Sequence, residues 1–437
     1  MITLIILLVL GLIAWLNLHP HWRPEILDAR FKTDFASGTG PEVRLRVEGS
    51  REVPEQYRGI ADIAAGASGT GVTPGNRVEV ITDGARKYNL LMHDLAAARE
   101  TIHMEYFLFG FDKGSRDVVN MLVKKAAEGV KVRFISDNLM NFPTYYRYRH
   151  VLKKGGVDVL RFTKPWELLH RFNFRNHRKI VVIDGRVAYT GGMNISDCYF
   201  LRWRDTHLRI EGGAVAQLQY LFLNSWHTSG GRLPKDWNTF FPLPDEGLMA
   251  APDSCRVQIV ADEPGLSPHP IEECYMKTLE LSKEYFFLQS PYFVPTKRLL
   301  ERIKEAARSG LDVRVMVPAK PEKITAFMKP LHKSYYRECL LAGIRLFEKR
   351  GEFMHSKTFV ADDTISCIGS ANFDCRSLLM AYEANALMYD RQTALLNRQI
   401  FLVDQQDCTE VTLGQLESVP WWDRLWQRVL RLFASML

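Results

Sequence analysis

The sequence predicts an α/β protein of two duplicated α/β lobes related by a pseudo-twofold axis, with one N-terminal transmembrane helix. Three observations carry this prediction: an internal repeat, strands that alternate with helices in each half, and an apolar run at the start of the chain. Such alternation is typical of α/β architecture. The 437 residues, of which 46% are hydrophobic, are enough for two to three domains.

The first element is the apolar run at residues 2–16, ITLIILLVLGLIAWL. Together with Asn17 and Leu18 it reaches the lower edge of what spans a bilayer, about 17 residues. No Lys or Arg precedes the run, whereas Arg23, Arg30 and Lys32 follow it. This charge order favours an uncleaved anchor with the rest of the chain in the cytosol over a cleaved secretory signal. We therefore predict a membrane anchor at residues 1–20.

The next segment, residues 21–75, contains clusters of Gly, Ser, Thr and Pro and is predicted to be a linker and lead-in. The first lobe is placed at 76–232, where a strand (102–107), a helix (116–128) and a strand (130–135) follow one another. The second lobe, 250–412, repeats this order at 286–288, 297–308 and 313–317. The Gly-, Pro- and Asp-rich segment 230–256 is the predicted connection between the lobes.

The internal repeat contains the string His-x-Lys-x4-Asp, followed in both copies by an Asn 17 residues and an acid 28 residues after the His. The first copy comprises His177, Lys179, Asp184, Asn194 and Asp205, and the second comprises His355, Lys357, Asp362, Asn372 and Glu383. With each charged type near ~6% of residues, chance gives about 0.04 such strings in this chain. Two copies with matched downstream spacing therefore indicate an internal duplication.

Each copy has the pattern of strand, turn and strand, at 178–189 and at 358–368. Because side chains at i and i+2 of a strand point to one face, the His and Lys of each copy should project together. Gly191-Gly192 and Gly369-Ser370 then let the chain pass close to the motif and place the Asn beside it. A pseudo-twofold arrangement would bring both copies to a shared face.

The two copies together supply two imidazoles, two ammonium groups and two carboxamides, which suits phosphodiester chemistry without a metal ion or other cofactor. Lys and Asn donors can hold the non-bridging oxygens. One neutral His can attack phosphorus while the other, as imidazolium, protonates the leaving alkoxide. The acids Asp205 and Glu383 are expected to fix the tautomer of each ring. Within this candidate catalytic set, Asp184 and Asp362 lie across a hairpin turn and are expected to brace rather than react.

Two other interpretations are disfavoured. A single His is usually structural, but chance does not supply the same donors twice. A metal site would need close His, Cys or carboxylate ligands, whereas here each His is paired with a Lys that repels a cation. The seven cysteines contain no Cys-x-x-Cys pair, which argues against a zinc site and a disulfide framework.

The chain resembles the phospholipase D superfamily and, more narrowly, its bacterial cardiolipin synthases. The strings FNFRNHRKIVVIDGRVAYTGGMNISD (172–197), SPYFVP (290–295) and MHSKTFVADD to GSANFDCRSLLMAYE (354–383) carry the resemblance. It implies a phosphatidyl-histidine intermediate and a reaction that joins two phosphatidylglycerols into cardiolipin with release of glycerol. It also implies that His177 is the nucleophile and that His355 acts as acid and then base.

The sequence departs from this resemblance at two places. Ser370 of the second copy corresponds to Gly192 of the first, so the two halves should not contribute equally. The family often has two N-terminal spans, whereas this sequence shows one. The resemblance implies phosphatidylglycerol, other anionic membrane lipids and the membrane as partners, with the anchored protein in the bacterial inner membrane and its catalytic body on the cytoplasmic side.

Alternative functions use the same chemistry. Water or serine could take the intermediate, as in a hydrolytic phospholipase D or a phosphatidylserine synthase. A nuclease would favour a continuous basic groove, and a net charge of +7 spread over the whole chain does not indicate a nucleic-acid partner. An inactive membrane scaffold would not need intact His, Lys and Asn in both halves.

Two aromatic segments are candidates to meet lipid. Residues 413–437 are predicted to be a C-terminal amphipathic helix with arginines opposite an apolar stripe. The stripe comprises Trp421, Trp422, Leu425, Trp426, Val429, Leu430, Phe433 and Met436. The helix could lie in the headgroup plane or dock on its own domain. Residues 199–204 could also meet lipid, although we expect Trp203 to lie in a core strand.

Overall fold

The computed structural model describes residues 53–434 apart from 138–141, 163–173, 234–235, 244, 252–253, 323–325 and 327. The predicted anchor at 1–20 and most of the predicted linker lie outside the described residues. Across the ranges that are described, no helix has both the length and the apolar character needed to cross a membrane.

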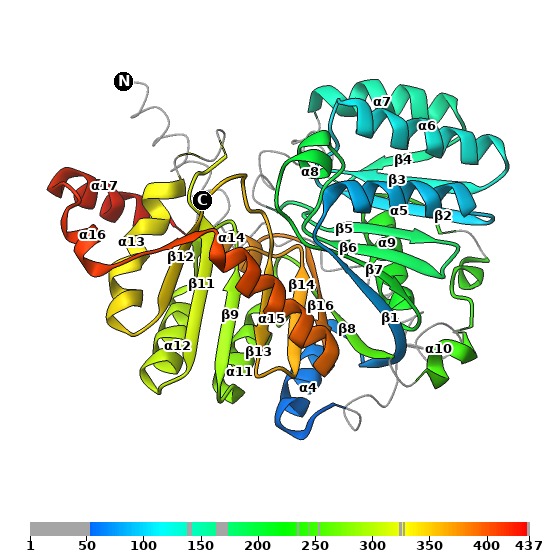
Figure 1. Ribbon diagram of the computed structural model, residues 1–437. Helices are drawn as coiled ribbons and strands as arrows, with labels where there is room; N and C mark the ends of the chain where they lie inside the picture. The colour runs from blue at the N-terminus through cyan, green and yellow to red at the C-terminus, as the bar shows by residue number, and fades with distance from the viewer. Residues whose placement is uncertain are drawn as a thin grey trace.

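A single mixed sheet of fifteen strands runs through both halves of the described chain (Figure 1). From the centre outward, the first half contributes β1 (Thr73–Ile81), β7 (His207–Glu211), β6 (Val187–Gly191), β5 (Lys179–Ile183), β2 (Thr101–Tyr106), β3 (Lys131–Ser136) and β4 (Asp158–Arg161). The second half contributes β8 (Cys255–Asp262), β16 (Glu383–Met388), β14 (Ile365–Gly369), β13 (Thr358–Ala361), β9 (Tyr285–Gln289), β11 (Asp312–Pro318), β12 (Arg345–Lys349) and the edge strand β17 (Cys408–Glu410).

The two halves have the same strand order and the same strand directions when each is read outward from the antiparallel β1–β8 pair. In each half the first strands pair antiparallel, and the three outer strands β2–β3–β4 and β9–β11–β12 pair parallel. A short parallel pair, β10 (Phe293–Val294) with β15 (Phe373–Asp374), lies outside the main sheet. The predicted α/β duplication is therefore confirmed by the strand topology.

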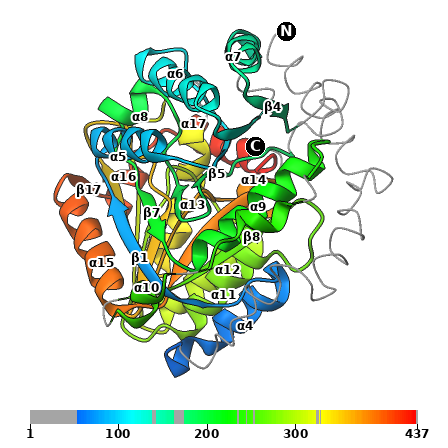
Figure 2. The ribbon, with the colours of Figure 1, turned by 90° about the vertical axis from the view of Figure 1, so that its right-hand side faces the viewer.

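Helices cover both faces of the sheet (Figures 1 and 2). In the first half, α5 (Gly84–Ala97), α6 (Lys113–Ala127) and α7 (Phe142–Lys154) pack on one face and α9 (Ala214–Thr228) on the other. In the second half, the corresponding helices are α11 (Pro270–Leu281), α12 (Lys297–Arg308) and α13 (Met328–Leu341), with α15 (Arg391–Gln406) opposite them. The predicted helices at 116–128 and 297–308 thus correspond to α6 and α12.

Part of the predicted linker is folded. Residues 55–57 form the 3-10 helix η3 (Glu55–Tyr57), which continues into α4 (Arg58–Ser68). α4 directly precedes β1, the first strand of the first half. It nevertheless packs in the core of the second half, against α11 and β8. The buried positions Tyr57, Ile60, Ala61 and Ala64 follow the spacing of one helix face. The Gly-, Ala- and Ser-rich composition of the segment hides this pattern.

Two further segments differ from the expectation. The connection at 230–256 contains the 3-10 helix η5 (Trp237–Phe240) and α10 (Glu246–Ala250), with Phe240 and Phe241 buried in the core beneath α9. The C-terminal segment forms two helices, α16 (Leu413–Glu417) and α17 (Trp421–Arg431), instead of one. Pro420 stands at the N-cap of α17. Because proline lacks the backbone N–H that a continuous helix would need, the helix is interrupted there.

The packing of α4 leads to a stability prediction. Ile60 is fully buried in the second-half core, so Ile60→Ala should lower the free energy of unfolding by about 2–5 kcal/mol. The matched control is Asp62→Ala on the exposed side of the same helix, which should change it by less than about 0.5 kcal/mol. Denaturant unfolding of the two purified variants measures the difference. Equal stability of both would mean that α4 acts as a linker.

Candidate active site

Each copy of the repeat is a β-hairpin, as predicted. β5 and β6 are joined by a turn at 184–186, and β13 and β14 by a turn at 362–364. Asp184, Asp362 and Asp363 have positive φ angles of 50–51°, which the short polar side chain of Asp tolerates. β5 begins at Lys179 and β13 begins directly after Lys357, so each His and Lys lies at one end of the hairpin and each Asp at the turn.

Within the candidate catalytic set, the two turn aspartates hold the hairpins in place, which agrees with the bracing role expected for them. Asp184 accepts hydrogen bonds from the backbone N–H groups of Arg99, Glu100 and Thr101, each at 2.8 Å. Asp362 accepts the equivalent bonds at Lys283, Glu284 and Tyr285, and another from the hydroxyl of Tyr57. Each carboxylate ties the hairpin to the strand beside it.

The chain just before each histidine crosses to the other half of the molecule. The N–H of His177 donates to the carbonyl of Tyr382 at 2.9 Å, and the N–H of His355 donates to the carbonyl of Arg204 at 2.7 Å. Both contacts belong to short parallel bridges, Asn176 with Tyr382 and Arg204 with Met354. Each histidine is thus placed next to the residue that precedes the acid of the opposite repeat.

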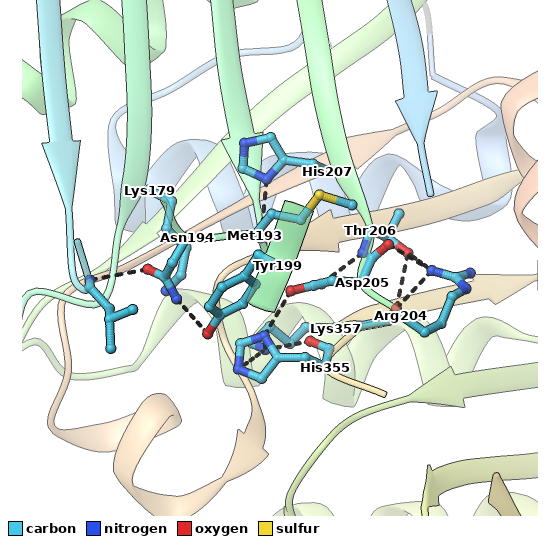
Figure 3. Close-up of polar contacts among 12 residues, drawn as sticks. Lys179, Met193, Asn194, Tyr199, Arg204, Asp205, Thr206, His207, His355 and Lys357 are labelled. Atoms are coloured by element: carbon cyan, nitrogen blue, oxygen red, sulfur yellow. Dashed lines mark hydrogen bonds and ion pairs between the residues drawn. The ribbon is translucent and has the colours of Figure 1, made fainter. Parts of the chain in front are cut away.

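This crossing pairs each imidazole with a carboxylate from the other half. The Nδ1 atom of His177 lies 2.9 Å and 3.1 Å from the two oxygens of Glu383. The Nδ1 atom of His355 lies 2.7 Å from Oδ2 of Asp205 (Figure 3). The acids thus contact the rings as expected, but the matched spacing of 28 residues suggested a partner within the same repeat. Each carboxylate accepts the Nδ1–H of its ring and leaves Nε2 with the lone pair.

The difference between Ser370 and Gly192 changes how the two acids are held. The hydroxyl of Ser370 donates to Oε2 of Glu383 and accepts from the N–H of Ala384 at 2.9 Å. At Gly192 a Cβ atom would lie 2.1 Å from Oδ1 of Asp205, so the shorter acid occupies the space of the missing side chain. That oxygen accepts a hydrogen bond from the N–H of Thr206 instead, at 2.7 Å. Both carboxylates are fully buried.

The two lysines lie beside the rings at different positions. The Nζ atom of Lys179 donates to the carbonyl of His177 at 2.5 Å. The Nζ atom of Lys357 donates to the carbonyl of His355 and also lies 2.9 Å from Nδ1 and 3.1 Å from Nε2 of that ring. In contrast, Nε2 of His177 makes no hydrogen bond with any residue of the described ranges. Only one of the two rings therefore keeps its second nitrogen open.

Burial controls the protonation of these groups. It lowers the pKa of His177 to about 4, with Glu383 opposing the shift and Lys179 adding to it. It lowers the pKa of His355 to about 3, with Lys357 adding to it and Asp205 opposing it. It also lowers the pKa of Lys179 to about 7 and that of Lys357 to about 8. Burial therefore favours the neutral form of both imidazoles.

The two asparagines of the repeats are held by neighbouring hydroxyl groups. Asn194 donates from Nδ2 to the hydroxyl of Tyr199 at 2.8 Å and accepts from the N–H of Leu108 at 3.1 Å. Asn372 donates to the hydroxyl of Ser377 at 3.2 Å, and its Oδ1 atom has no partner in the described part of the protein. Each carboxamide keeps one N–H for a ligand, consistent with the predicted contact to phosphate oxygens.

Three residues of the site were missed or misplaced from the sequence. Lys87 on α5 is fully buried and donates to the carbonyls of Met193 and Asn194, at 3.0 Å and 3.3 Å. A signal for it exists, because this lysine falls on the buried side of its helix together with Leu91. It holds the loop that carries Asn194.

Trp203 is the misplaced residue, because it lies in a loop beside His355 and not in a core strand. Its ring centroid is 5.6 Å from that of His355. Tyr199 and Phe353 also contact the His355 ring, with centroids at 5.3 Å and 6.0 Å. The three aromatic rings form a wall around this imidazole, part of which Figure 3 shows.

The third residue is Arg376 on α14 (Cys375–Leu379). Burial lowers its pKa, while Asp374 and Glu383 oppose this shift. Its charge in turn helps to lower the pKa of Arg175 to about 9, although burial is the larger cause. Arg175 is paired with Asp137, whereas the guanidinium of Arg376 makes no hydrogen bond or ion pair within the described part of the chain. No pattern in the sequence marked it.

The site as a whole is suited to an anion. Two lysines and Arg376 surround two imidazoles in a buried environment, where charge–charge interactions are strong. Among the residues that the structure describes, no group of three or more His, Cys, Asp or Glu side chains is arranged to hold a metal ion. A phosphodiester would supply the negative charge that compensates these cations.

The exchanged carboxylates lead to a specific prediction. Glu383→Gln should change the ring ¹⁵N resonances and tautomer balance of His177, and Asp205→Asn should change those of His355. Turnover should fall about 10²–10⁴-fold in each variant, because the ring loses the group that fixes its tautomer. Spectra of protein labelled at histidine measure the effect. A response of the histidine in the same repeat as the altered acid would contradict the exchanged pairing.

The lowered lysine pKa values lead to a second prediction. At pH 8 most Lys179 is neutral, since its pKa is about 7, and a bound anion favours the ammonium form. Binding of tungstate should therefore take up protons at pH 8, and its affinity should fall as pH rises from 7 to 9. Titration calorimetry in buffers of different ionisation enthalpy measures the uptake, with Lys179→Met as the control. Heats that are the same in all buffers would exclude this protonation.

Comparisons with known proteins agree with this geometry. The family profile described as "Cardiolipin synthase, PLD-like domain" matches residues 91–226 and 275–404, once in each half. A curated cardiolipin synthase of Alkalihalophilus pseudofirmus is 33% identical over 370 residues, covering 83% of this chain and 72% of that protein. One of Staphylococcus aureus (strain Mu50) is 35% identical over 375 residues, covering 84% and 74%.

A solved structure shares the fold. The crystal structure of phosphatidylserine synthase from Haemophilus influenzae Rd KW20 superposes with a TM-score of 0.65 at 15% identity, covering 87% of this chain and 100% of that one. At this identity the likeness concerns the fold alone. The family profile and the curated relatives, in contrast, extend over most of the sequence and contain both repeats. The chain belongs to the cardiolipin synthase family of proteins with phospholipase D-like domains.

Proposed function

We propose that this protein is a cardiolipin synthase that transfers a phosphatidyl group from one phosphatidylglycerol to another through a phosphohistidine intermediate, with release of glycerol. The observation that carries the proposal is the pair of imidazoles, each held through Nδ1 by a carboxylate of the other half. Membership of the family supports the same reaction class. Neither half could perform the reaction alone, because each depends on the other for its carboxylate.

In the first step, Nε2 of His177 attacks the phosphorus of the donor phosphatidylglycerol. The phosphorus–nitrogen bond forms while the bond to the glycerol oxygen breaks, and His355 gives that oxygen its proton. In the second step, the terminal hydroxyl of another phosphatidylglycerol attacks the phosphorus and gives its proton to His355. The bond to His177 breaks, and cardiolipin leaves. No net proton is consumed over the two steps.

The cations of the site have separate tasks in this mechanism. Lys179 and Lys357, with the free amide N–H groups of Asn194 and Asn372, hold the non-bridging oxygens of the reacting phosphate. Lys357 is also the nearest proton source for His355, because its Nζ atom lies 3.1 Å from Nε2. The anionic substrate raises the pKa of His355 from about 3, so that protonation follows binding.

The aromatic wall around His355 favours transfer over hydrolysis. Tyr199, Trp203 and Phe353 contact the ring of His355 and leave less room for water beside it. Water is present at about 55 M, but an acceptor alcohol held in line can reach effective molarities of about 10⁵ M or more. Arg376 interacts electrostatically with Glu383 and has no ion pair in the described protein, and in this proposal it binds the second phosphate that every phosphatidylglycerol acceptor carries.

The location of the protein is part of the proposal. Residues 1–20 anchor the chain in the bacterial inner membrane, with the catalytic halves on the cytoplasmic side. Phosphatidylglycerol and other anionic lipids of that membrane are the partners, and nucleic acid is not a substrate. The positive charge that follows the apolar run supports this orientation.

The reaction products test the proposal. The purified protein in vesicles of phosphatidylglycerol alone should form cardiolipin and glycerol in equal amounts, with phosphatidic acid as a minor product. His177→Ala should abolish turnover and prevent trapping of lipid phosphorus on the protein, whereas His355→Ala should abolish turnover but still trap it. Lipid extraction and mass spectrometry measure all three. Phosphatidic acid as the main product would identify a hydrolase, and a requirement for serine a phosphatidylserine synthase.

A further inference from the structure

The C-terminal helix α17 docks on the protein by an unexpected side. Its contacts with α13 include Arg431, which forms an ion pair with Glu338 at 2.6 Å and lies over the ring of Tyr335. Leu430 packs against the second-half core, and Ala434 is buried in it. These three residues lie on the side of the helix that carries most of its polar groups.

The apolar side of α17 is left facing solvent. Trp421, Trp422, Leu425 and Trp426 are exposed by 65%, 59%, 52% and 43%. An amphipathic helix of a globular protein normally turns its apolar stripe toward the core. Three tryptophans are thus exposed within two turns of the helix. Contiguous exposed apolar surface of this kind marks an interaction site, so we expect a partner to bind here.

The charges at the edge of this patch identify the partner. Arg424 and Arg428 are exposed beside the stripe, and neither forms an ion pair with any described residue. A stripe of tryptophan and leucine bordered by arginines fits the boundary between headgroups and acyl chains of an anionic bilayer. Tryptophan in particular favours this boundary, since its ring is apolar while its indole N–H can reach water.

The position of α17 relates a bound bilayer to the candidate active site. In both views α17, α14 and α8 (Asp197–Leu201) lie toward the upper side of the molecule and α4 and α10 toward the lower side, although Figure 1 shows α17 at the far left beside α13 and α8 right of the centre (Figures 1 and 2). α14 carries Arg376, and α8 carries Tyr199 beside His355. A bilayer bound at α17 would therefore face the end of the protein at which the candidate active site lies.

We propose that α17 is an interfacial helix that binds the surface of an anionic bilayer through Trp421, Trp422, Leu425 and Trp426. This binding turns the end of the protein that carries α8 and α14 toward the lipids. The part of this proposal that concerns the supply of lipid substrate rests on the proposed function. The binding of α17 to the bilayer does not. The contact is separate from the predicted anchor at 1–20, which would hold the chain at the membrane without orienting the site.

The test uses the full chain in vesicles of phosphatidylglycerol with brominated acyl chains, which quench the fluorescence of inserted tryptophans. The triple variant Trp421→Ser, Trp422→Ser, Trp426→Ser should lose a quenched component that the wild type shows. Cardiolipin formation from vesicles should fall at least about tenfold, whereas turnover of short-chain phosphatidylglycerol in detergent should be unchanged. The matched control is Leu396→Ser with Val403→Ser on α15, which removes similarly exposed apolar residues and should leave quenching and activity as in the wild type.

A second variant keeps the tryptophans and removes the charge. Arg424→Gln with Arg428→Gln should reduce quenching several-fold in vesicles rich in phosphatidylglycerol and not in neutral ones. Wild-type quenching in the triple variant would overturn the proposal, as would a dimer of the wild type that the triple variant dissociates, because a second copy would then cover the patch. Loss of quenching together with products other than cardiolipin would support the helix and contradict the proposed function.

Discussion

The exchange of carboxylates between the two halves is the constraint on which the site depends. Glu383 reaches across to His177, and Asp205 reaches across to His355. Each of these acids is fully buried, and a buried charge without its partner is strongly destabilising. The antiparallel β1–β8 pair and the two parallel bridges therefore have to hold the halves in one register. A site assembled in this way exists only when both halves are folded and docked.

The same docking explains why the site is electrostatically prepared for an anion. Lys179 and Lys357 are buried, and burial lowers the pKa of each toward neutrality. Such strongly shifted groups cluster at functional sites, because stability alone does not favour buried cations. The unfavourable free energy of burying the two ammonium groups is reduced because the carboxylates Asp205 and Glu383 lie in the same site. A bound phosphodiester would reduce it further. Charge stabilisation of this kind needs little rearrangement during the reaction.

Much of the fold and most residues of the site could be predicted from the sequence. Which carboxylate pairs with which histidine could not. The hairpins follow from local periodicity and turn residues, so the strands around His177 and His355 were placed correctly. The pairing depends on docking: Glu383 lies 206 residues from His177 in the chain, and equal spacing within each repeat favours the wrong partner. Helix α4 was missed because alanine and glycine carry little periodic signal, although Tyr57 and Ile60 are fully buried.

The asymmetry between the repeats bears on which histidine attacks phosphorus. Both rings are oriented by a carboxylate at Nδ1, so the difference lies at Nε2. The ammonium group of Lys357 lies 2.9 Å from Nδ1 and 3.1 Å from Nε2 of His355, which suits a ring that takes and returns a proton. Nε2 of His177 makes no hydrogen bond with a described residue, although each of the two lysines donates to the carbonyl of the histidine in its own repeat. The Ser370 hydroxyl further holds Glu383 in place behind the His177 ring, whereas Gly192 provides no such group for Asp205. An open lone pair on a firmly held ring suits a nucleophile, which is consistent with the role proposed for His177.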